Sequence, residues 1–202
     1  MTSQLTGLVA ILRGVTPADA VAVAEAVFAA GFDAVEVPYN SPDPLESIRR
    51  IRAAGPAHRR VGAGTVLTPD DVRRAADAGA SLIVSPNTRA DVVAETVRLG
   101  LASYPGAATP TEAFAALDAG ARAIKLFPSS AVGIDGMRAW ASVLPSGTEL
   151  VPVGGVDAAN LAEWARAGAA GAGIGTSLYR PGDTPEAVGA RAVELVRIWN
   201  DN

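Results

Sequence analysis

The chain has 202 residues, 49% of them hydrophobic, and a formal net charge of −4 at pH 7, which fits one domain with a large buried core. This acidic balance excludes the basic surface needed to bind nucleic acid or an anionic membrane, and no apolar run approaches the roughly 20 residues of a transmembrane helix. With no cysteine and one histidine, the sequence also excludes disulfides, cysteine nucleophiles and multi-histidine metal sites.

The beginning of the chain lacks a basic region followed by a long apolar run, so we expect no signal peptide and a soluble, cytoplasmic protein. Farther on, eight short apolar runs bounded by Gly or Pro alternate with alanine-rich amphipathic stretches. Runs of this kind are typical of strands buried on both faces of a parallel sheet. In chain order, the predicted strands are Leu8–Leu12, Ala34–Val37, Arg60–Ala63, Leu82–Val84, Leu101–Tyr104, Ala123–Phe127, Leu150–Val153 and Gly171–Ile174.

The stretches between these strands carry signals for the start and the end of helices. A capping hydroxyl followed by proline predicts helix starts at Thr16, Ser41, Thr68, Thr109 and Thr184. Glycines predict helix ends at Gly31, Gly79, Gly100, Gly120 and Gly168. Three further helices are expected over Ala158–Ala167 with Asp157 as its cap, from near Thr88–Asp91, and within Asp135–Leu144.

Eight strand–helix units without a long linker predict an α/β protein with a single (β/α)₈ TIM-barrel domain over residues 1–202. A doubly wound open sheet is the alternative, but no early Gly-x-Gly-x-x-Gly motif follows a strand. In a barrel, the functional side chains lie at the C-terminal ends of the strands and in the loops that follow them. Candidate site residues are therefore sought at these positions.

Lys125 is the only lysine among 17 basic residues, and it lies in an apolar predicted strand. It could point outward or pair with a carboxylate. Alternatively, burial lowers the pKa of a lysine and supplies the neutral amine that attacks a ketone, a reaction that the permanently charged guanidinium of arginine cannot perform. Glu36 lies in another apolar strand and is either a structural partner of Arg13 or Lys125, or a general acid and base beside the amine.

Other strand ends carry groups suited to anions. Arg13 could pair with Glu36 or hold a substrate carboxylate in a bidentate fork, and Thr65 follows Gly64 at a neighbouring strand end. Glycine-rich loops follow the last two strands, where barrels often bind phosphate through backbone N–H groups. The candidate phosphate-binding residues are Gly154, Gly155, Gly175, Thr176 and Ser177.

Five segments together resemble the family of 2-keto-3-deoxy-6-phosphogluconate (KDPG) and 2-keto-3-deoxy-6-phosphogalactonate (KDPGal) aldolases. They are Leu8–Gly14, Val35–Val37, Gly62–Val66, Ile124–Pro128 and Val153–Val156, and the resemblance continues to Gly175–Tyr179. It implies a class I aldolase in which Lys125 forms a Schiff base and Glu36 moves protons. It also implies that Arg13 and Thr65 hold the carboxylate end, while the glycine-rich loops surround the phosphate.

The same resemblance implies cleavage to pyruvate and glyceraldehyde 3-phosphate, no metal or other cofactor, and a homotrimer. Within the family, the galactonate branch is the better match, because Asn40 stands where KDPG aldolases usually have Arg and Val153 where they have Thr. We therefore expect a KDPGal aldolase, with a KDPG or dual-specificity enzyme as the alternative. A phosphosugar isomerase or epimerase, and a phosphate-ligand sensor without turnover, remain the alternatives outside the aldolases.

Overall fold

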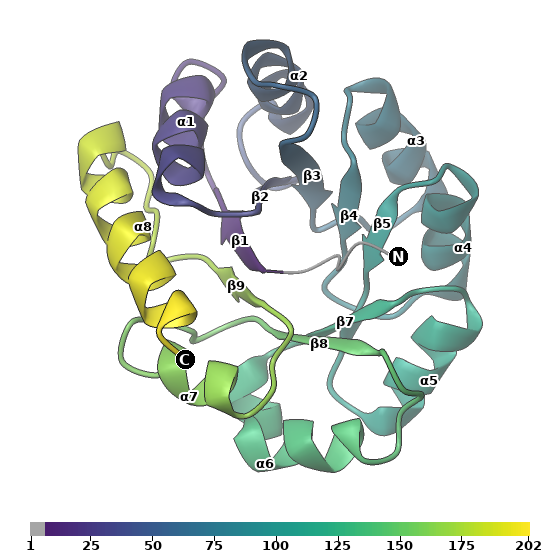
Figure 1. Ribbon diagram of the computed structural model, residues 1–202. Helices are drawn as coiled ribbons and strands as arrows, with labels where there is room; N and C mark the ends of the chain where they lie inside the picture. Colours follow the sequence, from purple (N-terminus) through teal and green to yellow (C-terminus); the bar gives the residue numbers. More distant parts are fainter. Residues whose placement is uncertain (1–6) are drawn as a thin grey trace.

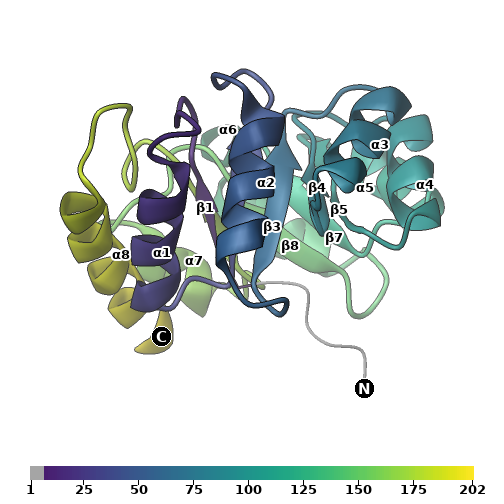
Figure 2. The ribbon, with the colours of Figure 1, turned by 90° about the horizontal axis from the view of Figure 1, so that it is seen from above.

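The computed structural model describes residues 7–202, in which strands and helices alternate along the chain. Figure 1 shows the helices as a ring around the strands, and Figure 2 shows α1 and α2 running alongside the strands that they cover. The strands are β1 Leu8–Ile11, β2 Ala34–Pro38, β3 Arg60–Gly64, β4 Leu82–Val84, β5 Ala102–Tyr104, β6 Gly106–Ala107, β7 Ala123–Leu126, β8 Glu149–Pro152 and β9 Ala172–Ile174. All their pairings are parallel.

The strands form two sheets that meet at both ends. One has the order β5-β4-β3-β2-β1-β9 and the other the order β6-β7-β8. At the first junction Pro105 separates β5 from β6, because proline has no N–H to donate to the ladder, yet its carbonyl still accepts from the N–H of Lys125 at 2.9 Å. At the second junction Val153 pairs with Gly173. Since β5 and β6 are consecutive parts of one staggered strand, the predicted (β/α)₈ barrel is confirmed.

The helices lie between the strands in the predicted order. They are α1 Ala20–Ala30, α2 Pro44–Ala54, α3 Pro69–Asp77, α4 Ala90–Arg98, α5 Pro110–Asp118, α6 Ser129–Ala141, α7 Leu161–Arg166 and α8 Pro185–Asn200. Thr68, Thr109 and Thr184 cap α3, α5 and α8 as predicted, each accepting a backbone N–H of the first turn. All five glycines that were predicted to end helices have positive φ, which favours glycine.

Other predicted helix starts were wrong. Thr16 opens a turn, and α1 begins only at Ala20. Ser41 does not cap α2, because its hydroxyl accepts the N–H of Gly14 in a neighbouring loop and α2 begins at Pro44. The helix expected within Asp135–Leu144 begins earlier, at Ser129, with a break at Gly133. Asp157 caps the turn that precedes α7, whose helix proper is shorter than expected.

Alternation along the strands separates two apolar layers. In β1, Leu8 and Ala10 pack in the layer beneath the helices, whereas Val9 and Ile11 belong to the cluster that fills the barrel. The same alternation places Ala123 of β7 and Ala34 of β2 inside the barrel. Lys125 and Glu36 lie two residues farther along these strands and therefore share the interior face.

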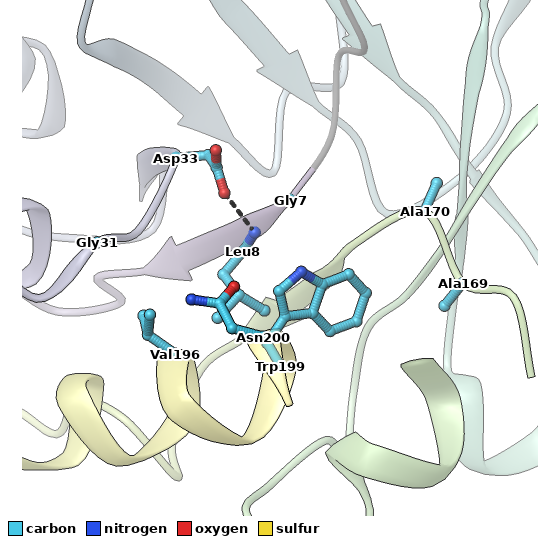
Figure 3. A pocket seen from close by; sticks show the side chains of 9 residues that line it. All are labelled: Gly7, Leu8, Gly31, Asp33, Ala169, Ala170, Val196, Trp199 and Asn200. Carbon is cyan, nitrogen blue, oxygen red and sulfur yellow. Dashed lines mark hydrogen bonds between the residues drawn. The ribbon is translucent and has the colours of Figure 1, made fainter. Parts of the chain in front are cut away.

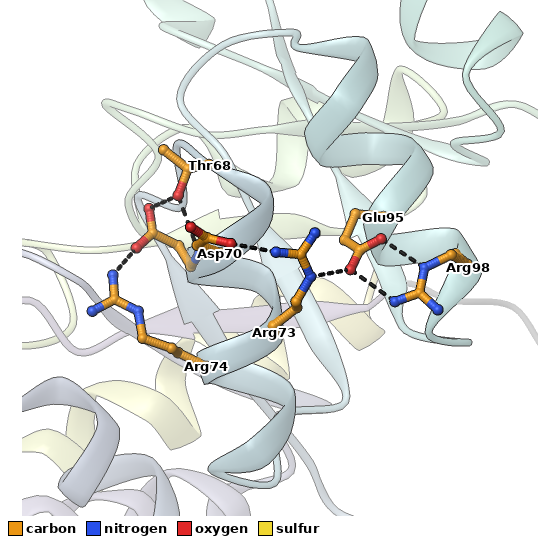
Figure 4. A network of polar contacts seen from close by, with 7 residues as sticks. Thr68, Asp70, Arg73, Arg74, Glu95 and Arg98 are labelled. Carbon is orange, nitrogen blue, oxygen red and sulfur yellow. Dashed lines mark hydrogen bonds and ion pairs between the residues drawn. The ribbon is translucent and has the colours of Figure 1, made fainter.

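An ion-pair network joins α3 to α4 on the outside of the barrel (Figure 4). The carboxylate of Glu95 accepts from Nε of Arg98 and from Nε of Arg73, each at 2.7 Å. The bonds from Arg98, followed by those from Arg73, lower the pKa of Glu95 to about 2, against the opposing effect of burial. The carboxylate of Glu95 thereby links α4 to α3.

Glu95→Gln is expected to lower the melting temperature at pH 7, because two guanidinium groups lose their shared anion. A depressed carboxyl pKa gives stability that is present above the unfolded value of 4.5 and is lost as the pH falls towards about 2. Thermal unfolding between pH 7 and 3 should therefore show the wild-type advantage shrinking below pH 4.5. The exposed Glu163 on α7 gives a matched control, Glu163→Gln. Equal melting temperatures for Glu95→Gln and wild type at every pH would contradict the prediction.

Among the helices of residues 7–202, none combines the length and the apolar character that crossing a lipid bilayer requires.

Candidate active site

Lys125 lies near the C-terminal end of β7 with its side chain inside the barrel, and only 6% of its surface is exposed. Burial lowers the pKa of its amine; the negative charge of Glu36 opposes this shift, and the positive charge of Arg13 adds to it. The Nζ atom stands 4.5 Å from the centre of the Phe127 ring. The surroundings therefore favour a larger neutral fraction of the amine than an exposed lysine has.

Glu36 reaches the same interior from β2 and is almost fully buried. Burial raises the pKa of its carboxyl to about 7, although the charges of Lys125 and Arg13 lower it. Within residues 7–202, Oε2 of Glu36 is buried and has no hydrogen-bond partner, and the carboxylate forms no ion pair. The predicted structural pairing with Arg13 or Lys125 is thus not made as a direct contact, and the carboxyl can hold or release a proton near neutral pH.

Gly64 provides the space that Glu36 occupies. A Cβ atom at this position would lie 1.5 Å from Oε2 of Glu36, so the carboxylate would have to move from its present place. Gly62, two residues earlier on the same face of β3, similarly makes room for Leu82. Both glycines of β3 therefore leave space inside the barrel for side chains of the neighbouring strands. The space beside Gly64 is the one that the carboxylate of Glu36 occupies.

A cavity of about 390 Å³ opens where the strands end. Lys125 lines it together with Arg13, Val153 and all five candidate phosphate-binding residues, Gly154, Gly155, Gly175, Thr176 and Ser177. A second, much smaller space inside the barrel is lined by both Glu36 and Lys125, as well as by Val153. Lys125 thus lies between an open cavity and the buried carboxylate, as a nucleophile with an adjacent proton carrier would.

Hydrogen bonds hold the two glycine-rich loops in place. The hydroxyl of Ser129 donates to the carbonyl of Gly154 at 2.6 Å, and that of Ser177 donates to the carbonyl of Val156 at 2.8 Å. Gly154 and Gly155 both have positive φ, 93° and 82°. In the part of the chain that the structure describes, no acceptor takes the backbone N–H groups of Gly155 or Thr176, whereas Gly154 directly follows the bridge between Val153 and Gly173. Free backbone N–H groups in loops of this kind can bind an anion.

Two predicted substrate-binding residues do not line the cavity. The side chain of Asn40 accepts Nη1 of Arg13 at 2.5 Å, so that Asn40 orients the guanidinium that does line it. Thr65 follows β3, is partly buried and has a φ of 57°, which is uncommon for a residue other than glycine. Both residues lie at the end of the barrel where the sequence placed them, and their predicted contact with a ligand stays a prediction.

Several lining residues were missed, and Arg180 is the most informative of them. It follows Ser177 by three positions in the loop after β9. The sequence could have identified Arg180 by its position, because an arginine beside a predicted phosphate-binding loop is a candidate contact to the phosphate. Asp157 also lines the cavity, but its Oδ1 accepts the N–H groups of Ala159 and Asn160, so this carboxylate serves as a cap.

A separate cavity of about 310 Å³, away from Lys125, lies where β1 begins, against the end of α8 (Figure 3). Among the described residues lining it, Asp33 carries the one charge, and its Oδ2 accepts the N–H of Leu8 at 2.9 Å. No cluster of three or more His, Asp or Glu side chains that could hold a metal occurs within residues 7–202. Lys125, near the C-terminal end of β7, lines the other cavity, where the strands end.

The chain resembles known proteins over nearly its whole length. A family model described as KDPG and KHG aldolase matches residues 2–186. The 2-dehydro-3-deoxy-6-phosphogalactonate aldolase of Escherichia coli (strain K12) is 48% identical over 194 residues, covering 96% of this chain and 95% of that protein. A probable enzyme of the same name from Rhizobium meliloti (strain 1021) is 45% identical over 193 residues, covering 96% of this chain and 91% of that protein.

A solved structure described as native KDPGal matches with a TM-score of 0.94 and 48% identity, covering 96% of this chain and 94% of that one. The residues that the family model matches include Lys125, Glu36 and the glycine-rich loops. The chain therefore belongs to the KDPG and KHG aldolase family.

Proposed function

We propose that this aldolase cleaves KDPGal, which is 2-dehydro-3-deoxy-6-phosphogalactonate, to pyruvate and glyceraldehyde 3-phosphate through a Schiff base on Lys125. The observation that carries the proposal is the buried amine at the floor of the cavity, with the carboxyl of Glu36 beside it. The names of two relatives at 45% and 48% identity support the substrate. An iminium is an electron sink, so this reaction needs no metal.

The reaction begins when the neutral Nζ of Lys125 attacks the C2 ketone. The resulting carbinolamine loses water and becomes an iminium. Glu36, in its ionised form, takes the proton of the C4 hydroxyl, directly or through a water. The C3–C4 bond then breaks, its electron pair moves towards the iminium to give an enamine, and glyceraldehyde 3-phosphate leaves. Protonation of the enamine at C3 by Glu36 and hydrolysis of the imine release pyruvate and restore the amine.

The other candidate residues have matching roles in this proposal. Arg13, oriented by Asn40, binds the carboxylate at C1, and Thr65 supports the same end of the substrate. The loops at Gly154, Gly155, Gly175, Thr176 and Ser177, which line the cavity, surround the phosphate at C6.

Incubation with pyruvate and borohydride tests the chemistry. A Schiff-base aldolase becomes irreversibly labelled on Lys125, whereas an isomerase or epimerase of the same fold and a non-catalytic sensor do not. Release of pyruvate from synthetic KDPGal tests the substrate in the same preparation. A folded protein that neither cleaves KDPGal or KDPG nor is trapped would overturn the proposed function.

The galacto preference rests on Val153. This side chain is buried, lines both the cavity and the inner space, and packs where Gly173 has no side chain. A Thr hydroxyl here could bond the C4 hydroxyl in one configuration, but Val153 cannot, and a site that bonds a substrate hydroxyl discriminates better than an apolar one. KDPGal should therefore be cleaved at least as efficiently as KDPG.

Val153→Thr is expected to move the ratio of kcat/KM for the two substrates several-fold towards KDPG, which is about the effect of one net hydrogen bond. The change preserves size and branching, so the barrel packing provides little other reason for a shift. Steady-state kinetics with both substrates measures the ratio, and Val143→Thr on the exposed surface is the control. A wild-type enzyme that strongly prefers KDPG, with a ratio unmoved by Val153→Thr, would refute the galactonate assignment alone.

We also propose a cytoplasmic homotrimer, as the family resemblance implies. Exposed apolar side chains on the outer helices, among them Val97, Phe114 and Val193, provide surface for contacts between subunits. Light scattering coupled to size exclusion measures the mass of the assembly. A mass equal to that of one chain at micromolar concentration would contradict the trimer.

A further inference from the structure

Arg180 lines the cavity from the loop after β9, the same loop that carries Gly175, Thr176 and Ser177. Its Nε atom donates to the carbonyl of Thr176 at 3.2 Å. One edge of the guanidinium is thereby turned towards the loop that holds it. Within residues 7–202, its two terminal nitrogens make no hydrogen bond, and their planar arrangement suits phosphate oxygens.

Asp183, which precedes α8, holds the backbone of Arg180 and is itself bonded to Arg191 of α8. Oδ2 of Asp183 accepts the N–H of Arg180 at 2.9 Å and also accepts Nη2 of Arg191, which lies on the helix. The negative charge of Asp183 is therefore paired with Arg191. Asp183 holds the Arg180 backbone and forms no direct ion pair with its side chain.

Arg180 has no carboxylate partner within residues 7–202, unlike Arg73, Arg74, Arg89 and Arg98 on the outer helices. The other guanidinium in the cavity, that of Arg13, is likewise bonded to a neutral acceptor, Asn40. Cations without a direct ion-pair partner at the wall of a cavity favour an anionic ligand. The two arginines lie in the loops after β1 and β9, which are neighbouring strands of the barrel, and both line the same cavity.

We propose that Arg180 binds the phosphate of the substrate and supplies the positive charge that the glycine-rich loops lack. The loops offer neutral backbone N–H groups, whereas a phosphate carries close to two negative charges at pH 7. Charge-assisted bonds from a guanidinium are roughly twice as strong as neutral ones. This proposal rests on the proposed function for its substrate, but its anion-binding part can be tested separately.

Arg180→Met is expected to raise the KM for KDPGal about tenfold, with a smaller change in kcat, because the phosphate contact is the same before and during bond cleavage. In the synthetic direction, the preference for glyceraldehyde 3-phosphate over unphosphorylated glyceraldehyde should fall about tenfold as well. Arg180→Lys should recover part of both effects. Arg122→Met is the matched control, because Arg122 is exposed and precedes β7 at the other end of the barrel.

Titration calorimetry with inorganic phosphate separates this proposal from the proposed function. A weaker phosphate affinity in Arg180→Met, but not in Arg122→Met, would support the role of Arg180 even in a protein that cleaves no keto-deoxy sugar acid. Unchanged phosphate affinity together with an unchanged ratio for the two aldehydes, in an Arg180→Met protein with a wild-type circular dichroism spectrum, would overturn it and leave the aldolase assignment intact. Arg180→Gln repeats the test if the Met variant does not fold.

Discussion

Lys125→Arg should abolish C–C cleavage while the barrel stays folded. Arginine keeps the positive charge and much of the length of lysine, but its guanidinium stays protonated in proteins and cannot form the iminium. The buried position of Lys125 makes this contrast sharp, because burial lowers the pKa of the amine and so favours the nucleophilic form. Turnover is expected to fall below detection, and labelling by pyruvate and borohydride at position 125 should disappear.

The uniqueness of this lysine allows a strict control. The double variant Lys125→Arg/Arg122→Lys again contains one lysine, but outside the barrel, and should be neither active nor labelled at residue 122. Arg122→Lys alone should retain cleavage and be labelled only at Lys125, as peptide mapping can show. Substantial cleavage by a folded Lys125→Arg protein would be incompatible with the Schiff base.

Glu36→Gln is expected to reduce kcat by about 10²–10⁴-fold with little change in KM, which is the usual contribution of a general acid and base. Gln fills the same space beside Gly64 but cannot take up a proton. The exchange of the C3 protons of pyruvate with solvent reports proton transfer directly, since it needs the enamine but no second substrate. Wild-type exchange rates in Glu36→Gln would mean that the carboxyl has only a structural role.

The pH dependence gives a further test of the same carboxyl. Burial raises the pKa of Glu36 to about 7, and the base that takes the C4 proton must be ionised, so the cleavage rate should rise as the pH passes upward through 7. This limb of the profile should be absent in Glu36→Gln. Any limb that reports the neutral fraction of Lys125 should remain, which separates the two groups.

The sequence by itself determined the features that depend on local patterns. The eight apolar runs, the hydroxyl-proline starts at Thr68, Thr109 and Thr184, and the glycine helix ends all appear where they were predicted. Lys125 and Glu36 could be identified because a charged side chain in a short, doubly buried strand contradicts its surroundings, and such contradictions mark functional sites. The candidate phosphate-binding loops could be identified by their glycines and by their position after the last two strands, because functional groups of a barrel lie at the C-terminal ends of its strands.

The tertiary structure alone decided how these groups meet. Asn40 and Arg13 are 27 residues apart, and their bond exists only because β1 and β2 lie side by side in this register. The need for Gly64 arises from the carboxylate of Glu36 on the adjacent strand, and Arg180 enters the cavity because Asp183 and α8 fix its loop. Spacing along the chain carries no signal for such contacts, because they depend on the stagger and curvature of the closed barrel, which all eight units set together.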